Sequence, residues 1–374
     1  MESIIDVLGE VYNCGIKGKV YRLLYRLNEN SKIKVSTPVG VTEEASTQEN
    51  VGQGTIEGAI ISATSIGGGV DEYFGDSKYE VWYEDTRLQP AAFQDDVARM
   101  FGGRVEAQVG NQLMEIVAES KLLSYNLDKS AFMVVGTPNN KEGLEEELEE
   151  QPLVLCGQNM KRVHEYSYLG TVISDRGVSE SVTASVNSKA GKVKRLIYEI
   201  RAVVEDCRND IPGGFCTALQ IWEAAVIPYL YNAAECWVEV PKEALATLNS
   251  LQETFMTTML ATPRTTPKVA MYWEMGVPLA ENRIIEQKLR FYHHLVCLDN
   301  EAIASKIHQC QKRLKFNSLT SECSKYLAQL NISEAEIKGY SKVQFKKTLR
   351  EKFDIKCDVQ LTQYFKEVLK LRDS

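Results

Sequence analysis

The sequence lacks the features that mark several large classes of protein. Its 374 residues contain 9 cysteines but no Cys-x2-Cys pair, which argues against a zinc knuckle and against a disulfide scaffold. No apolar run is long enough to span a bilayer. Residues 1–12 include Glu2, Asp6 and Glu10 and no basic start of a secretory signal. We therefore expect a soluble intracellular protein in a reducing compartment, nuclear or cytoplasmic, with no membrane partner.

The chain also lacks a basic excess. Its net charge is −8, which excludes a protein whose whole surface coats nucleic acid. The average conceals an asymmetry, because residues 1–150 carry a net charge of −13 and residues 151–374 a net charge of +5. Part of the acidic excess is the run 141–150, which predicts a solvated loop or a frayed helix. Opposite signs in the two parts indicate different partners.

Hydrophobic periodicity predicts an α+β part followed by an all-α part. Strand-like and helix-like segments mix up to about residue 175, and residues 165–173 read as one strand with a central glycine. Beyond that point apolar residues recur at spacings of three and four. The predicted division is 1–175, 176–265 and 266–374, and the predicted helices span 178–204, 216–227, 241–260, 279–298 and 301–314.

Asp95 and Asp96 are the first candidates for chemistry. They lie between the apolar segments 91–93 and 97–100, a pattern that predicts a hairpin turning at the two aspartates. Two adjacent carboxylates raise each other's pKa unless a cation neutralises them, so the pair suggests a metal site. Aspartate also favours turns for structural reasons, and the pair alone fits either interpretation.

Several short motifs follow one another in a recognisable order. They are Val51-Gly-Gln-Gly-Thr55, Phe93-Gln-Asp-Asp96, Asn126-Leu-Asp-Lys-Ser130, Tyr168-Leu-Gly170 and, in the helical part, Leu219-Gln-Ile-Trp-Glu-Ala-Ala-Val-Ile-Pro-Tyr-Leu-Tyr231 with Glu235 and Trp237. This order resembles the reverse transcriptases, or RNA-directed DNA polymerases, of non-LTR retrotransposons. The resemblance covers most of the chain. It implies an incomplete polymerase palm, an antiparallel sheet with packing helices, followed by an all-α thumb and connector.

The resemblance also implies a reaction and its partners. The family is a nucleotidyltransferase that uses two Mg²⁺ (or Mn²⁺) ions, an RNA template, a DNA primer or their hybrid, and dNTPs. Asp95 and Asp96 would bind the metal ions, and Lys129 would neutralise the departing pyrophosphate. Further residues would contact nucleotide or template (Gly52, Gln53, Gly54, Phe93 and Asn126) or form the strand that supports the primer end (Tyr168, Leu169 and Gly170). Each has an ordinary alternative as a loop glycine, a surface lysine or a core strand.

Basic residues in the helical part have two interpretations. Lys189, Lys192, Lys194, Arg195 and Arg201 recur on one predicted helix, and Lys312, Arg313, Lys315, Lys342, Lys346, Lys347 and Arg350 follow near the end. Such spacing suits phosphate contacts along a nucleic acid. A solvated helix face has the same pattern.

The chain departs from the family in one important respect. The family draws a further catalytic aspartate from an early Phe-x-Asp strand and has a fingers region, and neither has a counterpart in this sequence. Two interpretations follow: a truncated polymerase that is inactive as given, or a non-catalytic protein that binds nucleic acid or a protein partner. An unrelated α+β protein is the third. A sheet that lacks its early strand has an exposed edge, so we expect poor solubility.

Overall fold

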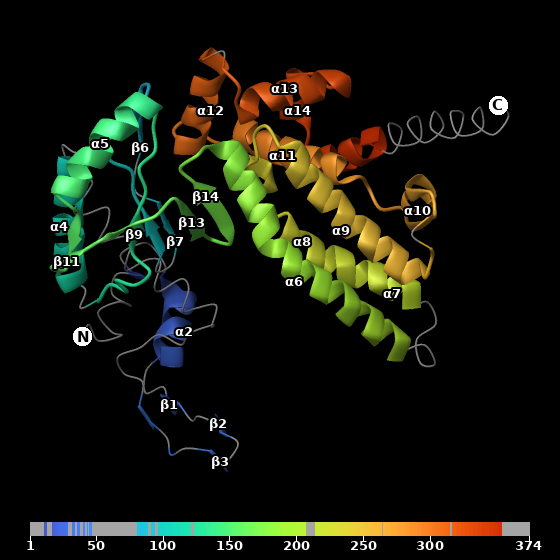
Figure 1. Ribbon diagram of the computed structural model, residues 1–374, viewed down its shortest axis with the longest axis horizontal. Coiled ribbons are helices and arrows are strands. Elements are labelled where there is room, and N and C mark those ends of the chain that lie inside the picture. The colour runs from blue at the N-terminus through green and yellow to red at the C-terminus, as the bar shows by residue number, and fades with distance from the viewer. Residues whose placement is uncertain are drawn as a thin grey trace. The chain divides into compact units, whose positions relative to one another are not determined.

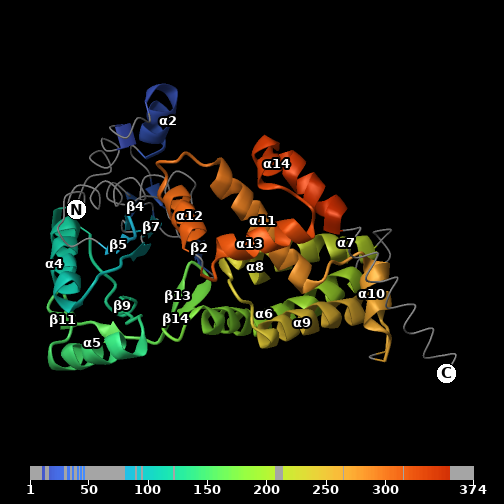
Figure 2. The same cartoon turned by 90° about the horizontal axis from the view of Figure 1, so that it is seen from above.

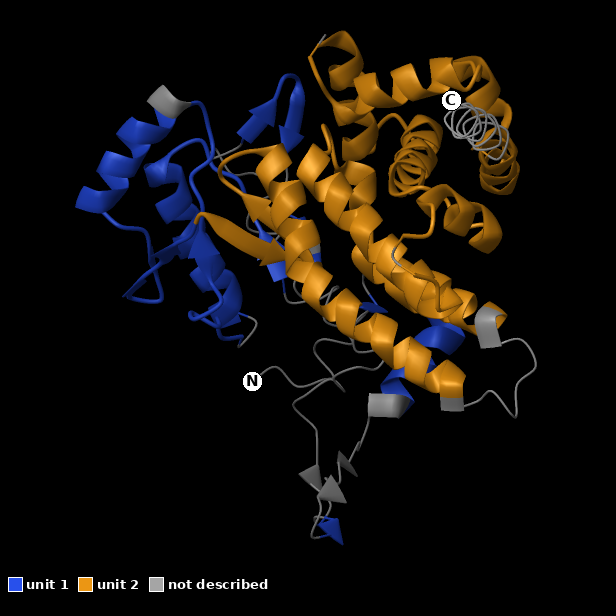
Figure 3. Cartoon of the chain, turned by 45° about the vertical axis from the view of Figure 1, so that its right-hand side comes forward, with its two compact units in different colours: residues 1–163 blue, residues 164–374 orange. Residues whose placement is uncertain are grey.

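The computed structural model (Figure 1) describes residues 11–12, 17–28, 32–33, 36–37, 40–41, 43, 45–46, 81–88, 91–93, 96–120, 123–206, 214–263, 265–314 and 316–353. Helices combine with small strand pairs, which confirms the α+β class at the level of secondary structure. The chain forms two compact units, residues 1–163 and 164–374 (Figure 3). None of the helices in these ranges is long and apolar enough to cross a membrane. The three-part division of the sequence remains a prediction.

The described part of unit 1 consists of helices and short strand pairs. The helices are α2 (Gly18–Asn28), α4 (Arg104–Ser120) and α5 (Pro138–Glu150). The antiparallel pairs are β1 (Lys32–Ile33) with β4 (Ala45–Ser46), β2 (Ser36–Thr37) with β3 (Gly40–Val41), β5 (Val81–Tyr83) with β6 (Thr86–Leu88), β7 (Ala91–Phe93) with β8 (Asp96–Ala98), and β10 (Val154–Leu155) with β11 (Gln158–Asn159). Strand β12 (Lys161–Arg162) pairs in parallel with β9 (Ala131–Phe132). Within the described ranges each sheet has two strands.

Side-chain amides of α4 hold strand β10. Gln108 accepts a hydrogen bond from the N–H of Val154 at 2.8 Å and donates one to its carbonyl oxygen at 3.0 Å. Asn111 donates to the same oxygen at 3.1 Å. The two amides therefore satisfy backbone groups of a strand whose described partner, β11, is only two residues long.

The acidic run forms a helix. Helix α5 begins at Pro138, a residue well suited to the first helical position because its missing N–H would have no partner there. Two of its carboxylates pair with arginines outside the helix: Glu147 with Arg104 at 3.1 Å, and Glu145 with Arg162. Leu148 of the same helix is buried. Of the two alternatives, the helix is the one observed.

Unit 2 begins with a hairpin and continues as helices. The hairpin consists of β13 (Glu165–Tyr168) and β14 (Thr171–Ser174). The helices are α6 (Val178–Asp206), α7 (Gly214–Ile221), the π turn η1 (Trp222–Val226), α8 (Ile227–Leu230), the 3-10 turn η2 (Ala234–Cys236), α9 (Lys242–Leu260), α10 (Lys268–Met275), α11 (Ala280–Cys297), α12 (Ile303–Arg313), α13 (Leu319–Gln329), α14 (Glu334–Gly339) and a last helix over residues 342–353. The five predicted helices of this part are confirmed to within a few residues, except that 216–227 is interrupted.

The main core of unit 2 lies between α6, α9 and the segment α7–η1–α8. Helices α6 and α9 lie side by side in both views (Figures 1 and 2). Trp222 and Phe255 are fully buried there, and their rings stack with centroids 4.1 Å apart. A second cluster joins α11, α13, α14 and the last helix. Each fully buried large apolar side chain stabilises the fold by about 1.5–3 kcal/mol.

Proline explains the interruption in the α7–α8 segment. Pro228 has no N–H and cannot bond to the carbonyl four residues earlier, on Ala224. The preceding residue, Ile227, instead donates its N–H to the carbonyl of Trp222, five residues back, which closes a π turn. The carboxylate of Glu223 in this turn forms a two-pronged ion pair with Arg283 of α11, in which one arm measures 3.0 Å.

Candidate functional site

The hairpin β7–β8 carries the first predicted motif. Phe93 pairs with Asp96, Ala92 with Val97 and Ala91 with Ala98, so the hairpin is confirmed, but Asp96 belongs to the second strand and not to the turn as predicted. Residues 94 and 95 connect the strands. Asp95 lies outside the described residues, whereas Asp96 is the first residue of β8 and is exposed, as is Phe93. A connection of two residues suits a tight turn, which holds neighbouring side chains in a fixed relation.

A small apolar cluster in unit 1 joins this hairpin to the second motif. Val97 of β8 and Tyr125 both pack against Met114 of α4. The Tyr125 hydroxyl donates to the carbonyl oxygen of Met114 at 2.8 Å. Burial raises the pKa of Tyr125 to about 12, so the hydroxyl stays a donor at neutral pH. The cluster therefore fixes the residue before Asn126 against the helix that also supports Asp96's strand.

Arg99 directly follows strand β8, and its side chain forms hydrogen bonds with helix α4. Its guanidinium donates to the carbonyl oxygen of Gly110 at 2.5 Å and to the side-chain oxygen of Asn111 at 3.1 Å. Burial lowers its pKa to about 10, which still leaves it charged at neutral pH. These bonds tie the end of β8 to α4.

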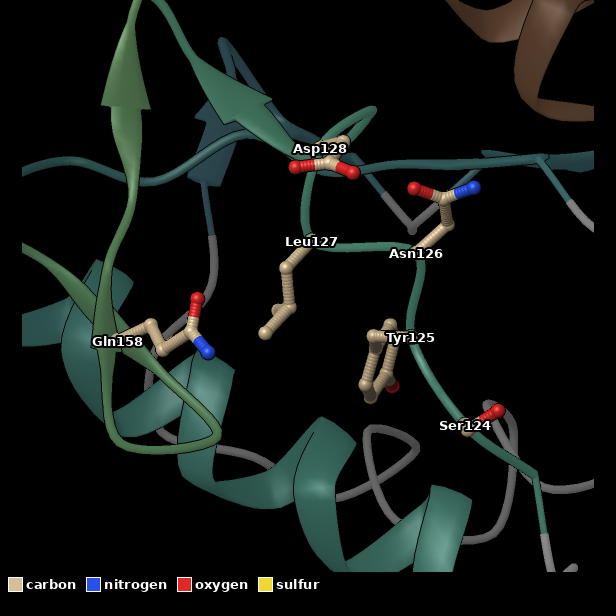
Figure 4. Close-up of a pocket in the computed structure, with 6 residues that line it drawn as sticks. All are labelled: Ser124, Tyr125, Asn126, Leu127, Asp128 and Gln158. Carbon is tan, nitrogen blue, oxygen red and sulfur yellow. The ribbon is translucent and has the colours of Figure 1, made fainter.

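Asn126 shapes the loop of the second motif. Its side-chain oxygen accepts from the N–H of Lys129 at 3.3 Å, and its carbonyl accepts from the N–H groups of Lys129 and Ser130 at 3.1 and 3.0 Å. An open pocket of about 510 Å³ lies beside this loop (Figure 4), lined by Ser124, Tyr125, Asn126, Leu127, Asp128 and Gln158. Lys129 is exposed and does not line the pocket.

The remaining unit 1 predictions cannot be placed. Gly52, Gln53 and Gly54 lie outside the described residues, together with the whole segment 51–80. Across the described ranges no group of three or more His, Cys, Asp or Glu residues gathers as a metal site would. Two adjacent aspartates remain a fitting donor set for Mg²⁺, which prefers oxygen ligands and takes few of them from the protein.

The Tyr-Leu-Gly motif is a turn, and the expected single strand is wrong. Tyr168 ends β13 and pairs with Thr171, and Leu169 and Gly170 form the two-residue connection. Both have positive φ, 49° and 75°, the backbone of a primed hairpin turn. Glycine adopts this conformation without strain, whereas leucine does not. The predicted primer-supporting residues thus lie at an exposed hairpin tip.

Helix α6 and the turn after α8 hold this hairpin. Ser185 accepts from the N–H of Val172 at 2.9 Å and donates to its carbonyl at 3.1 Å, and Ser181 accepts from the N–H of Ser174 at 2.9 Å. At the tip, the Asn232 side-chain amide donates to the carbonyl of Leu169 at 2.9 Å. Sequence reasoning missed Asn232, although it directly follows the 219–231 motif, because that motif assigns no role to this position.

Lys189 is not on the phosphate-facing side predicted for it. It is 3% exposed, and its ammonium lies 3.4 Å from the carbonyl oxygen of Asn232. Burial lowers its pKa to about 8. The burial of Lys189 follows from its place in the helix. Spacings of three and four put it on the same side of α6 as the buried residues Val182, Val186, Val193 and Ile197.

Most of the other predicted cations of α6 form ion pairs or ring contacts with neighbouring side chains. Arg195 pairs with Glu199 at 3.2 Å and Arg201 with Glu205 at 2.8 Å. The Lys192 ammonium lies 4.7 Å from the centre of the Tyr229 ring, within cation–π range. Lys194 is exposed. A solvated helix face therefore describes α6 better than a phosphate-binding face.

Comparison with known proteins adds no relative. A scan against protein-family models gives no match, and a search of curated proteins gives no significant match.

Proposed function

We propose that this chain is a portion of a reverse transcriptase of the non-LTR retrotransposon kind, with a partial palm and a helical thumb. The proposal rests on the motif order and on one structural observation, the pairing of Phe93 with Asp96 across a two-residue connection. That register makes Asp96 the first residue of β8, directly after the two-residue connection, and a carboxylate there would suit metal-assisted nucleotidyl transfer. The helices after β14 are consistent with a thumb.

Asp95 and Asp96 are the residues that would hold Mg²⁺ or Mn²⁺ in this proposal. When bound, the ions stabilise negative charge on the attacking and leaving oxygens. The protein's own contribution is to hold strand β8, which begins at Asp96, through Val97 packed on Met114 and through Arg99 bonded to Gly110 and Asn111. Lys129, exposed beside the Asn126 turn, would supply positive charge near the phosphates.

Catalysis by the purified chain is not expected. The family uses a further aspartate from an early strand, and these 374 residues contain no counterpart. A two-metal site that loses one of its carboxylates loses most of its rate, as other catalytic units do when one member is removed. The proposed activity of this chain by itself is therefore template binding without primer extension.

Manganese binding tests the proposal without relying on activity. Mn²⁺ bound to the chain should be detectable by electron paramagnetic resonance, and the double substitution D95N/D96N should abolish that binding. The hairpin β5–β6 provides a matched control, because Glu84 and Asp85 form its own acidic two-residue connection. The variant E84Q/D85N should bind Mn²⁺ like the wild type. Equal Mn²⁺ binding by D95N/D96N and wild type would refute the metal site.

Primer extension on an RNA template completes the test. We expect no extension by the wild type or by D95N/D96N, with RNA binding retained by both. Extension by the wild type alone would show that the chain supplies the further carboxylate itself. Absence of both Mn²⁺ binding and RNA binding would contradict the polymerase origin.

A further inference from the structure

The last described helix, residues 342–353, carries an unusual concentration of positive charge. It contains five basic residues and one acidic residue: Lys342, Lys346, Lys347, Arg350, Lys352 and Glu351. Its start is fixed by a reciprocal cap, in which Ser341 accepts from the N–H of Gln344 at 3.3 Å and Gln344 accepts from that of Ser341 at 2.9 Å. The helix therefore begins at a defined residue, and its sides are defined too.

One side of this helix packs in the second apolar cluster of unit 2. Phe345, Leu349 and Phe353 are buried at spacings of four. The Phe345 ring stacks on His293 of α11, with centroids 4.8 Å apart and planes 14° from parallel. This packing fixes the helix's rotation about its own axis.

Three cations form a row beside the buried side. Lys342, Lys346 and Arg350 also follow at spacings of four, which places them about 6 Å apart along the axis. Lys342 and Arg350 are exposed and Lys346 is half-buried. None of the three forms an ion pair with another residue of the described ranges. We call Lys342, Lys346 and Arg350 the basic row.

The basic row differs from several cations of unit 2 that pair with acidic side chains on the same helix. Arg195, Arg201 and Lys347 each pair with a glutamate four residues later. By contrast, Lys342 is followed four residues later by Lys346, and Lys346 by Arg350, so these two neighbours are cations; the residue four after Arg350, Asp354, lies outside the described residues. Like charges at this spacing destabilise a helix by about 0.2–0.5 kcal/mol per pair, and a bound polyanion removes that cost. Lys338 of α14, four residues before Lys342, is exposed and adds positive charge, whereas Lys352 lies near the carboxylate of Glu336.

We propose that the basic row binds the phosphodiester backbone of a nucleic acid. Three cations in line at even spacing match a linear polyanion with regularly spaced charges. A membrane surface fits less well, because the bulky apolar residues of the helix are buried and Val343 alone among its apolar residues is exposed. The inference does not depend on the metal hairpin, which belongs to the other unit.

Fluorescence anisotropy with a labelled RNA–DNA hybrid tests the proposal. The full chain is compared with K342Q/K346Q/R350Q over about 50–200 mM salt. The triple variant should bind at least about tenfold more weakly, and its slope of log K against log salt should be shallower by about 2–3, close to one per lost phosphate contact. The charge-preserving variant K342R/K346R/R350K should bind like the wild type.

A matched control removes the same charge from paired positions. Lys268, Arg290 and Lys306 pair with Glu253, Glu286 and Glu301 respectively. The variant K268Q/R290Q/K306Q should keep wild-type affinity and slope. The proposal is overturned if both triple variants weaken equally, if the basic-row variant binds like the wild type, or if anionic vesicles or polyglutamate compete as well as the hybrid does. Because D95N/D96N keeps the basic row, its hybrid binding should match the wild type, which separates this test from the test of the metal site.

Discussion

The ammonium group of Lys189 lies 3.4 Å from the carbonyl oxygen of Asn232, on the buried side of α6. Asn232 in turn donates to the carbonyl of Leu169 at 2.9 Å. One buried cation, one carbonyl and one amide thus link the middle of α6, the turn after α8 and the tip of the β13–β14 hairpin. The stability of this tip should therefore depend on the protonation state of Lys189.

Replacing Lys189 with methionine should stabilise unit 2 at neutral pH. The fold lowers the pKa of Lys189 from 10.5 to about 8. Between these values the unfolded chain binds a proton that the folded chain does not, so wild-type stability rises with pH through this window. K189M should gain about 1–2 kcal/mol at pH 7, and the gain should shrink as the pH approaches 10. Thermal unfolding of both proteins across this pH range measures it. A gain that does not change with pH would contradict a buried charge as the cause.

Asparagine should fit the backbone conformation at position 169 better than the natural leucine does. The φ of Leu169 is 49°, a left-handed conformation that costs leucine about 1 kcal/mol and that asparagine adopts more easily. L169N should therefore raise the free energy of unfolding by about 0.5–1 kcal/mol. Gly170 provides the opposite test, because an added Cβ would lie 3.2 Å from the Asn232 side-chain nitrogen and φ is also positive. G170A should be destabilising by about 1–2 kcal/mol. Denaturant unfolding of both variants checks the signs.

Lys288 and Glu322 should be strongly coupled. The Lys288 side chain is 1% exposed, and its ammonium lies 2.5 Å from Glu322, whose other oxygen accepts the N–H of Glu239 at 2.8 Å. Removing either partner leaves a buried charge alone and should cost about 3 kcal/mol. The double variant K288M/E322L should cost less than the sum of K288M and E322L. Thermal unfolding of the wild type, both single variants and the double variant gives a double-mutant cycle. If the losses of the single variants add up in the double variant, the two residues are not coupled.

Two glycines in helices of unit 1 should respond oppositely to alanine. A Cβ at Gly110 of α4 would lie 2.3 Å from the Phe101 ring, whereas a Cβ at Gly143 of α5 would meet no atom within 4 Å. G110A should destabilise α4 by about 1–3 kcal/mol, and G143A should stabilise α5 by about 0.5–1 kcal/mol. Hydrogen–deuterium exchange of peptides from each helix reads the two effects separately. Faster exchange in α5 of G143A, or unchanged exchange in α4 of G110A, would count against the packing described here.

Local patterns predicted much of the fold and little of its tertiary detail. The spacing of Val182, Val186, Val193 and Ile197 was sufficient for α6, and the apolar residues around Asp95 and Asp96 were sufficient for the hairpin. Helix α10 was missed because it is only eight residues long. The strand reading of Tyr168-Leu-Gly170 failed because alternation of side chains continues across a tight turn, and only the backbone angles distinguish the two.

In the candidate site, too, the sequence indicated positions along the chain but not the contacts between distant residues. Position along the chain indicated Phe93, Asp96, Asn126 and Lys129, and the structure links the two segments through Val97, Met114 and Tyr125. Asn232 and the burial of Lys189 depend on contacts between residues 43 or more positions apart. Sequence periodicity contains no information on such pairs, although the spacing of Lys189 from Val182, Val186, Val193 and Ile197 is consistent with its buried position.

The π turn at Trp222–Val226 gives the helical segment 214–230 a spare residue. An α-helix closes each hydrogen bond over four residues and a π turn over five, so the turn accommodates one position more than the helix on either side needs. Loss of a single residue there would remove the extra position and leave Ala218 and Leu230 facing the same core. The same loss in the middle of α6 would rotate everything beyond it by about 100°. The chain can thus change length within a segment that packs in the core without changing which side chains form that core.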